Sequence, residues 1–264
     1  MSAEQDRDLV DPDAAPGWLK GLVDNLAAVP TAQSRYIPAD VQAAFKVASA
    51  AAMAKAAVTG AKRDAAVLVL VSGPPDAPAD VLPDTADLLL TVRASTLRNH
   101  AGQAAFPGGA SDPEDTGPVD TALREAREET GIDTDRLRPL AVLDRMFIPP
   151  SNFHVVPVLA YSPDPGPVGV VSPGETAIVA RVPVRAFTNP ENRLMVYRKE
   201  RSRRYAGPAF LLNQMLVWGF TGQVVSAILD VAGWARPWDT DDVRELDSAM
   251  ALVGATSDYG DGQR

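Results

Sequence analysis

Three glutamates near the middle of the chain have a spacing that suits metal binding. Glu125, Glu128 and Glu129 occupy positions i, i+3 and i+4 of a stretch that ends at Gly131. Residues at this spacing share one face of a helix, so the three carboxylates would point in the same direction. Clustered carboxylates repel one another, and a hard cation such as Mg²⁺ or Mn²⁺ relieves that repulsion. The three glutamates are therefore candidate metal ligands.

The same residues have a simpler interpretation. Arg124 and Glu128 form an i,i+4 pair of opposite charge, which is common on the solvated face of a helix. Taken alone, the four charged residues favour such a salt-bridged surface. The choice between the two interpretations depends on the surrounding sequence.

Composition excludes several classes of protein. The chain has 264 residues, a formal net charge of −9 and no cysteine. The acidic balance argues against a general nucleic-acid-binding protein, and the lack of cysteine excludes disulfides, thiolate catalysis and cysteine-ligated zinc. No stretch has the pattern of a signal peptide or of a membrane span. We expect a cytoplasmic protein with neither a nucleic-acid nor a membrane partner.

The chain is expected to form one domain. Residues 1–15 and 254–264 have the composition of disordered tails, and residues 16–253 form the domain between them. Its first part, 16–60, is a helical extension that no motif covers.

Two helices are predicted within this extension. Apolar spacing indicates one over 18–28, which Pro30 would end, and an alanine-rich run indicates another over 39–59, which Gly60 would end. Both are candidates for packing against the body of the domain or for a contact in a homodimer.

Apolar runs bounded by turn residues predict a core rich in strands. Pro118 suits the first turn of a helix and Gly131 its C-terminal cap, so the glutamates lie on a helix between them. We expect strands over 65–73, 87–94, 140–149, 154–163, 176–184 and 210–212, and a closing helix over 215–231.

The nine residues Arg124 to Ile132, REAREETGI, carry a resemblance to a known family. They match the second half of the Nudix box, G-x5-E-x7-R-E-U-x-E-E-x-G-U, in which U is apolar, so the chain resembles the Nudix hydrolases. The first half departs from the box. Counting forward from Gly109 places the upstream acid at Asp115, whereas counting back from Arg124 places it at Thr116. The loop thus has one extra residue, and the role of the upstream acid stays open.

A second pattern narrows the resemblance. Residues 89–109 read LLTVRASTLRNHAGQAAFPGG and agree with the signature LLTxR[SA]xxxRxxxGxxxFPGG of the coenzyme A pyrophosphatases within the Nudix hydrolases. Residues 217–221, VWGFT, are similar to a later segment of that subfamily. The resemblance implies an α+β fold, an α/β/α sandwich with a mixed sheet and extra N-terminal helices. It also implies metal-dependent hydrolysis of coenzyme A to 3′,5′-ADP and 4′-phosphopantetheine, with Mg²⁺ or Mn²⁺ as the cofactor.

The resemblance implies roles for individual residues. Glu125, Glu128 and Glu129 would hold the metal with the carbonyl of Gly109, and Glu175 would join Glu125 and Glu128 in catalysis. Four residues would bind the substrate: Arg93, Arg98, His100 and Gln103. The simpler interpretation of Glu175 is a glutamate exposed on a surface loop. For the four substrate-binding candidates, the simpler interpretation is structural pairing around the loop of paired glycines.

Other interpretations remain open. A basic cluster at 198–205 is either a solvated hairpin or loop or a contact for the 3′-phosphate of coenzyme A. A Nudix hydrolase of NADH, ADP-ribose or a nucleoside triphosphate would use the same metal face. A non-catalytic nucleotide-binding module is the alternative outside the enzymes, but such modules tend to have lost the box glutamates that this chain retains.

Overall fold

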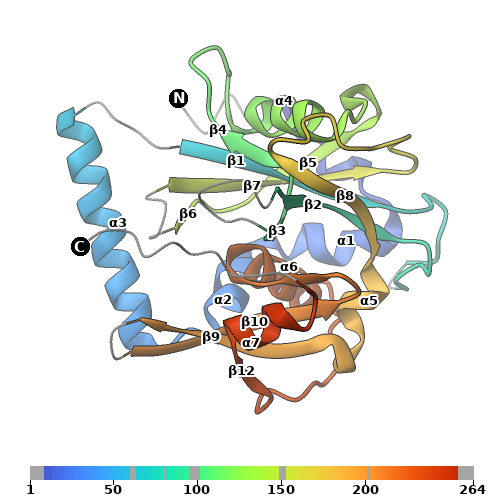
Figure 1. Ribbon diagram of the computed structural model, residues 1–264. Coiled ribbons are helices and arrows are strands. Elements are labelled where there is room, and N and C mark those ends of the chain that lie inside the picture. The colour runs from blue at the N-terminus through green and yellow to red at the C-terminus, as the bar shows by residue number, and fades with distance from the viewer. Residues whose placement is uncertain are drawn as a thin grey trace.

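The computed structural model describes residues 9–59, 64–79, 81–94, 102–148, 153–200 and 203–254 (Figure 1). Within these ranges a mixed eight-stranded sheet has the order β3-β2-β1-β7-β5, with β4 beside β1, β6 beside β7 and β8 beside β2. The central strands β1 and β7 are parallel and the other pairs are antiparallel. The strands are β1 (Asp64–Ser72), β2 (Asp87–Arg93), β3 (Ala104–Ala105), β4 (Gly108–Ala110), β5 (Arg138–Val142), β6 (Met146–Ile148), β7 (Phe153–Ser162) and β8 (Thr176–Pro183).

Both faces of this sheet are covered by helices. Successive side chains of a strand point to opposite faces. In β1, Leu68 and Leu70 pack with buried residues of α4 (Pro118–Thr130), whereas Val69 and Val71 pack with α1 (Gly17–Asp24) and α6 (Gly219–Val231). The predicted α/β/α sandwich is confirmed, and burial on both faces explains why the central strands read as continuous apolar runs.

A second sheet lies on the far side of α6 (Figure 1). Its order is β11-β10-β9-β12, and α7 (Leu246–Ala251) packs against it. Its strands are β9 (Arg193–Glu200), β10 (Arg203–Leu212), β11 (Met215–Val217) and β12 (Val243–Glu245). The described residues of the basic cluster at 198–205 pair at the end of the β9–β10 hairpin, with Arg198 opposite Tyr205 and Lys199 opposite Arg204, and residues 201 and 202 lie outside the described residues. Short helical segments complete the described chain at Pro12–Ala14, Leu26–Ala28, Thr134–Arg136, Val184–Thr188 and Pro190–Asn192.

The N-terminal segment differs in part from the prediction. The helix expected over 18–28 is divided, and Pro30 opens α2 (Val29–Ser34) rather than ending the preceding helix. Proline suits the first turn of a helix because the missing N–H has no intrahelical acceptor there. The alanine-rich helix α3 (Ala39–Thr59) follows as predicted.

One strand prediction and the start of the predicted closing helix were also wrong in detail. The strand expected over 140–149 is two strands, β5 and β6, separated at Leu143–Arg145. Met215–Val217, assigned to the closing helix, is strand β11, which pairs with β10 through a two-residue turn at Asn213 and Gln214. Gln214 has φ 63°, a conformation that glycine usually supplies, so the sequence carries no strong turn signal there.

Among the described residues, no helix is both long and apolar enough to cross a membrane.

Close packing between α6 and β10 depends on Gly222. A Cβ added at this position would lie 2.6 Å from the carbonyl oxygen of Pro208. We predict that Gly222→Ala lowers the free energy of unfolding by about 1–3 kcal/mol, because α6 must move away from the sheet. Urea denaturation measures the change.

The matched control is Gly21→Ala in α1, where an added Cβ meets nothing within 4 Å. Alanine favours a helix interior over glycine, so this variant should gain up to about 1 kcal/mol. Equal stability of the Gly222 variant and the parent would contradict the close approach.

Candidate active site

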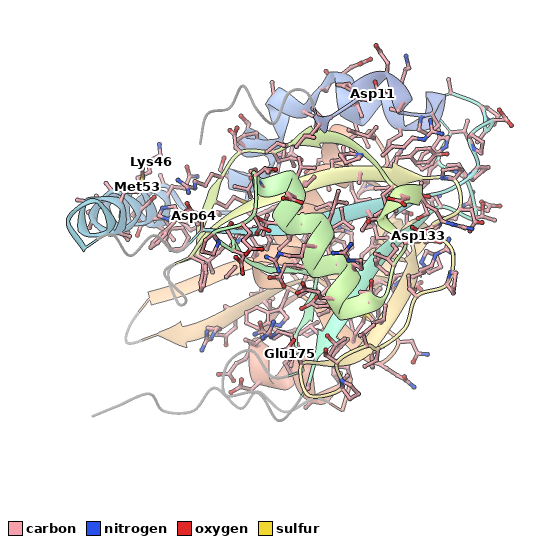
Figure 2. The ribbon with its side chains drawn as sticks, turned by 90° about the horizontal axis from the view of Figure 1, so that it is seen from above. Asp11, Lys46, Met53, Asp64, Asp133 and Glu175 are labelled. Atoms are coloured by element: carbon pink, nitrogen blue, oxygen red, sulfur yellow. The ribbon has the colours of Figure 1, made fainter. Side chains whose placement is uncertain are left out.

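Helix α4 presents the box residues above the larger sheet. Gly131 caps its C-terminus with φ 67°, and the Gly131 amide donates to the carbonyl oxygen of Arg127. The packed side of the helix consists of buried Val119, Ala122 and Ala126. Figure 2 shows α4 lying across the sheet with the charged side chains around it.

The two glycines of β4 lie directly against the glutamates. The Gly108 amide donates to Glu129 Oε2 over 3.2 Å. A Cβ added at Gly109 would lie 2.4 Å from Glu125 Oε2, so only glycine leaves this carboxylate in place. A Cβ added at Gly108 would lie 2.4 Å from the carbonyl oxygen of Ala66, and its φ of 155° also favours glycine. These close contacts therefore explain why the signature ends in two glycines.

Arg124 connects the box to the loop before it. Its Nε and Nη2 atoms each donate to Asp115 over 2.9 Å, and Nη2 also donates to the Ala110 carbonyl over 3.1 Å. The Nη1 atom donates to Glu125 over 2.9 Å and to Glu128 over 3.2 Å. One guanidinium thus bridges three carboxylates, which offsets their mutual repulsion.

The ambiguity over the upstream acid is resolved by this network. Asp115, with a side chain 4% exposed, pairs with Arg124 and also accepts from the Thr121 hydroxyl and the Asp112 amide. Arg124 is the largest influence on Asp115 and holds the pKa of its carboxyl well below the usual range. Thr116 instead donates to Asp120 in the first turn of α4. Asp115 therefore orients Arg124, and Thr116 belongs to the helix cap.

Glu125 and Glu129 form the electrostatic centre of the site. Burial raises the pKa of both carboxyls, that of Glu129 to about 7. For Glu129, the Gly108 amide and the charge of Arg93 oppose this rise, while the charges of Glu125 and Glu175 add to it. Two carboxylates in this setting would be stabilised by a bound cation.

The other predicted residues differ in their placement. Glu175, on the turn before β8, lies near enough to Glu129 to affect its pKa (Figure 2). Arg93 ends β2, and its amide donates to the carbonyl oxygen of Gln103 over 3.0 Å. The Glu128 side chain is 55% exposed. Arg98 and His100 lie outside the described residues.

In the part of the chain that the structure describes, no three acidic or histidine side chains converge as a ready-made metal cage. Glu125 and Glu128 each bond to Arg124 Nη1. The glutamates thus share a helix face as predicted, but Glu125 and Glu129 are the pair that meets β4. The predicted Arg124–Glu128 pair is present, whereas the role of Thr121 and the pairing of Arg124 with Asp115 were missed by sequence reasoning.

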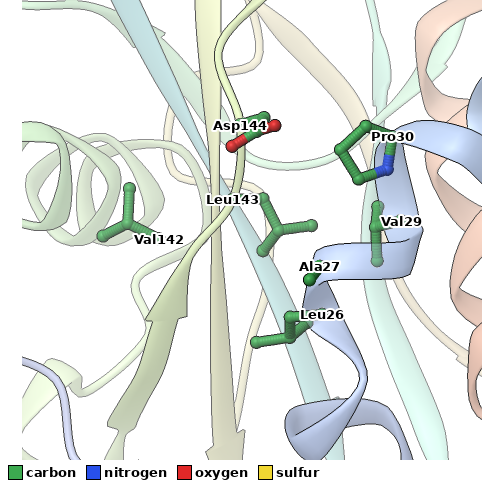
Figure 3. Close-up of a pocket in the computed structure, with 7 residues that line it drawn as sticks. All are labelled: Leu26, Ala27, Val29, Pro30, Val142, Leu143 and Asp144. Carbon is green, nitrogen blue, oxygen red and sulfur yellow. The ribbon is translucent and has the colours of Figure 1, made fainter.

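A separate pocket of about 170 Å³ lies between the N-terminal helical segments and the end of β5 (Figure 3). Among the described residues that line it, Asp144 is the one charged residue and none belongs to α4, β4 or the Glu175 turn. This pocket is therefore not part of the candidate active site.

The Arg124–Asp115 pair generates a stability prediction. Asp115→Asn removes the charge that pairs with Arg124 but leaves Arg124 bonded to Glu125 and Glu128, so it should lower the free energy of unfolding by about 1.5–3 kcal/mol, the range for hydrogen bonds to charged groups. The control Thr116→Ala removes only a cap contact and should cost about 1 kcal/mol or less. Chemical denaturation measures both changes. A larger loss for the Thr116 variant would mean that the upstream acid has been misassigned.

Comparisons with known proteins agree with the box. The sequence profile of the NUDIX domain matches residues 64–199, just over half of the chain. A protein of Photorhabdus laumondii subsp. laumondii named "Uncharacterized Nudix hydrolase NudL" is 34% identical over 138 residues, which are 52% of this chain and 73% of that protein.

A second relative with the same name, from Pectobacterium atrosepticum, is 45% identical over 102 residues, 37% of this chain and 46% of the relative. Among solved structures, a Nudix hydrolase from M. Smegmatis, RenU, is 24% identical with a TM-score of 0.38, covering 47% of this chain and 72% of that one. The profile match and the Photorhabdus relative show that this chain belongs to the Nudix hydrolase family.

Proposed function

We propose that the protein hydrolyses the diphosphate of coenzyme A, and of its thioesters or disulfide, to 3′,5′-ADP and the corresponding phosphopantetheine. The observation that carries the proposal is the agreement of residues 89–109 with the coenzyme A pyrophosphatase signature. The end of that segment, Gly108 and Gly109, contacts Glu129 and Glu125. The segment that distinguishes the substrate class thus ends at the glutamates of the box.

The donor atoms at the centre of the site fit Mg²⁺ or Mn²⁺. Mg²⁺ is commonly held by one or two carboxylates, with waters and substrate phosphates as its other ligands. Glu125 and Glu129 would supply the carboxylates and Gly109 a backbone carbonyl, so a site of this type needs no third acidic side chain. Glu128 would contribute at the solvent-exposed edge. When bound, the metal would neutralise the diphosphate and activate water.

The remaining residues have roles that their positions allow. Arg93 acts electrostatically on Glu129, and its guanidinium would bind a substrate phosphate. Gln103, hydrogen-bonded to Arg93 through the backbone, would line the same part of the site, and Arg98 and His100 of the signature complete the proposed substrate-binding set. Glu175 would orient the attacking water, or act with Glu125 and Glu128 in accepting its proton.

Substrate assays test the proposal directly. Coenzyme A, dephospho-coenzyme A, NADH and ADP-ribose are compared at equal concentration with Mg²⁺ and with Mn²⁺, and the products are separated by chromatography. We expect metal-dependent release of 3′,5′-ADP, with coenzyme A the best of the four substrates. Faster hydrolysis of NADH or ADP-ribose would replace the proposal with the other Nudix activity, and no hydrolysis of any substrate would favour the non-catalytic module.

Substitution of the central glutamates tests their role. Glu125→Gln and Glu129→Gln each remove a charge that would hold the metal, so kcat/KM should fall by at least about 100-fold, as for the loss of a metal-binding group. Exposed Glu191 lies on a 3₁₀ turn outside the site, and Glu191→Gln is the matched control that should keep full activity. Retention of activity by both glutamate variants would exclude the assigned metal site.

The raised pKa of Glu129 predicts a dependence of stability on pH. Its carboxyl titrates near 7 in the folded chain and near 4.5 in the unfolded chain, so the folded state binds more protons between these values. The contribution of Glu129 to stability is therefore fully present below about pH 4.5 and is lost as the pH rises through 7. In EDTA, the contribution of Glu129 should fall by about 2 kcal/mol between pH 5 and 8.

Denaturation at these two pH values measures the effect, with Glu129→Gln as the reference that lacks the titrating group. Adding Mg²⁺ at pH 8 should stabilise the parent protein more than this variant. The same pH dependence in both proteins would show that Glu129 is not the group responsible.

A further inference from the structure

Large apolar side chains are exposed on both sides of Glu175 in the sequence. Among the described residues nine large apolar side chains are exposed, and three of them, Val170, Val171 and Ile178, lie within five residues of Glu175. The other six lie elsewhere in the described chain: Leu9, Val47, Met53, Val81, Val243 and Leu252. Exposed apolar residues that gather at one place indicate contact with a ligand or another molecule.

Two of these residues, Val170 and Val171, form what we call the exposed valine pair. Neither packs against the three clusters of buried apolar residues in the described chain, whereas Val168 of the same segment does. Ile178 lies opposite Val92, whose side chain belongs to the cluster on the α6 face of the sheet, so Ile178 is separate from the pair. The packing of the described chain therefore does not account for two consecutive valines here.

Hydrogen bonds hold the exposed valine pair at the C-terminal end of α4. The Gly169 amide donates to the carbonyl oxygen of Thr130 over 3.0 Å, and the Val171 amide donates to that of Glu129 over 3.4 Å. A Cβ added at Gly131 would lie 3.2 Å from Val171 Cγ2, so the valine side chain also lies against the helix end. Val171 is thus bonded to a residue whose carboxylate belongs to the proposed metal site.

The chain after the pair leads to other groups of the proposed site. The Glu175 amide donates to the carbonyl oxygen of Ser172 over 3.0 Å, and the Ala94 amide donates to that of Glu175 over 2.8 Å. Ala94 follows Arg93, which ends β2. The segment from Val171 to Glu175, of which Glu175 is labelled in Figure 2, therefore connects the end of α4 with the end of β2. Both ends carry groups that would hold the diphosphate.

Coenzyme A differs from the other candidate substrates next to its diphosphate. On its pantetheine side, the CH₂ of the phosphate ester is bonded to a carbon that carries two methyl groups. In NADH and ADP-ribose, the corresponding position belongs to a ribose with its hydroxyl groups. An apolar side chain beside the diphosphate favours methyl groups, whereas hydroxyls placed against it lose hydrogen bonds to water.

We propose that Val171, with Val170 beside it, contacts these two methyl groups and so favours coenzyme A over NADH and ADP-ribose. The inference rests on the proposed function, because it takes the diphosphate to be bound at Glu129 and Arg93. The metal site would fix the diphosphate, and the exposed valine pair would recognise the first apolar group beyond it. This contact is common to free coenzyme A, its thioesters and its disulfide, since all of them carry the same two methyl groups.

Truncating Val171 and removing the methyl groups from the substrate test the same contact. With Mg²⁺ present, kcat/KM is measured for the parent and for Val171→Ala, each with coenzyme A and with a synthetic coenzyme A that lacks the two methyl groups. The parent should be about fivefold to tenfold slower on the demethylated substrate, less than for a fully enclosed apolar contact because this one is open to solvent. Val171→Ala should lose as much on coenzyme A, but no more than about twofold further on the demethylated substrate, because one contact can be lost only once.

The matched control is Val81→Ala. Val81 and Val171 are both 54% exposed in loops, but Val81 lies before β2 whereas the proposed site lies at the end of β2. This variant should keep the activity of the parent on both substrates. Circular dichroism and the denaturation midpoint check that the variants remain folded.

The outcomes separate this inference from the proposed function. A parent that releases no 3′,5′-ADP from coenzyme A would overturn both. With an active parent, an equal loss by Val171→Ala on the two substrates would show that the truncation disturbs Glu129 rather than a methyl contact, and would overturn the inference alone. A parent that hydrolyses the demethylated substrate as fast as coenzyme A would do the same.

Discussion

The close approach of β4 to α4 is the constraint on which the candidate site depends. Gly109 has no side chain, and this lets the Glu125 carboxylate lie against the backbone. Gly108 and Gly109 also pair with β1 at Val67 and Ala66. The pairing of β4 and the positions of the two carboxylates therefore depend on the same few contacts.

Arg124 makes this concentration of carboxylates tolerable without a metal ion. Its guanidinium neutralises Asp115 and part of the charge of Glu125 and Glu128. Burial raises the pKa of the Glu129 carboxyl, although the Gly108 amide and the charge of Arg93 oppose this rise. The site thus contains two kinds of carboxylate. The pKa of Asp115 is held low by its ion pair with Arg124, whereas the pKa of Glu129 is raised at the position where a cation would bind.

Much of the fold could be predicted because local patterns and tertiary packing agree. Alternate residues of β1 are buried on both faces, and Gly131 ends α4 where a left-handed cap is needed. The β10–β11 turn was missed because Gln214 adopts a conformation that a side chain disfavours. The parallel pairing of β12 with β9 joins residues far apart in the chain, and no local pattern reports such a contact.

The candidate site was predictable to a similar degree. Helical spacing identified the glutamates that share a face, but it could not show which of them meet β4. Because the loop has one extra residue, counting along the box could place the upstream acid at either Asp115 or Thr116. The distinction came from three-dimensional packing, which buries Asp115 beside Thr121 and leaves Thr116 at the helix cap.

The position of α6 between the two sheets has a consequence for folding cooperativity. Buried residues of α6 belong to one continuous cluster that also contains β2 of the larger sheet and β10 of the second sheet. The NUDIX profile ends at residue 199, at the far end of β9. A chain cut there would lose the partner strand of a hairpin and helix α6 from one layer of the sandwich. The end of the profile match thus falls within elements that share one cluster of buried residues, and the segment beyond it packs against the sheet that carries β4.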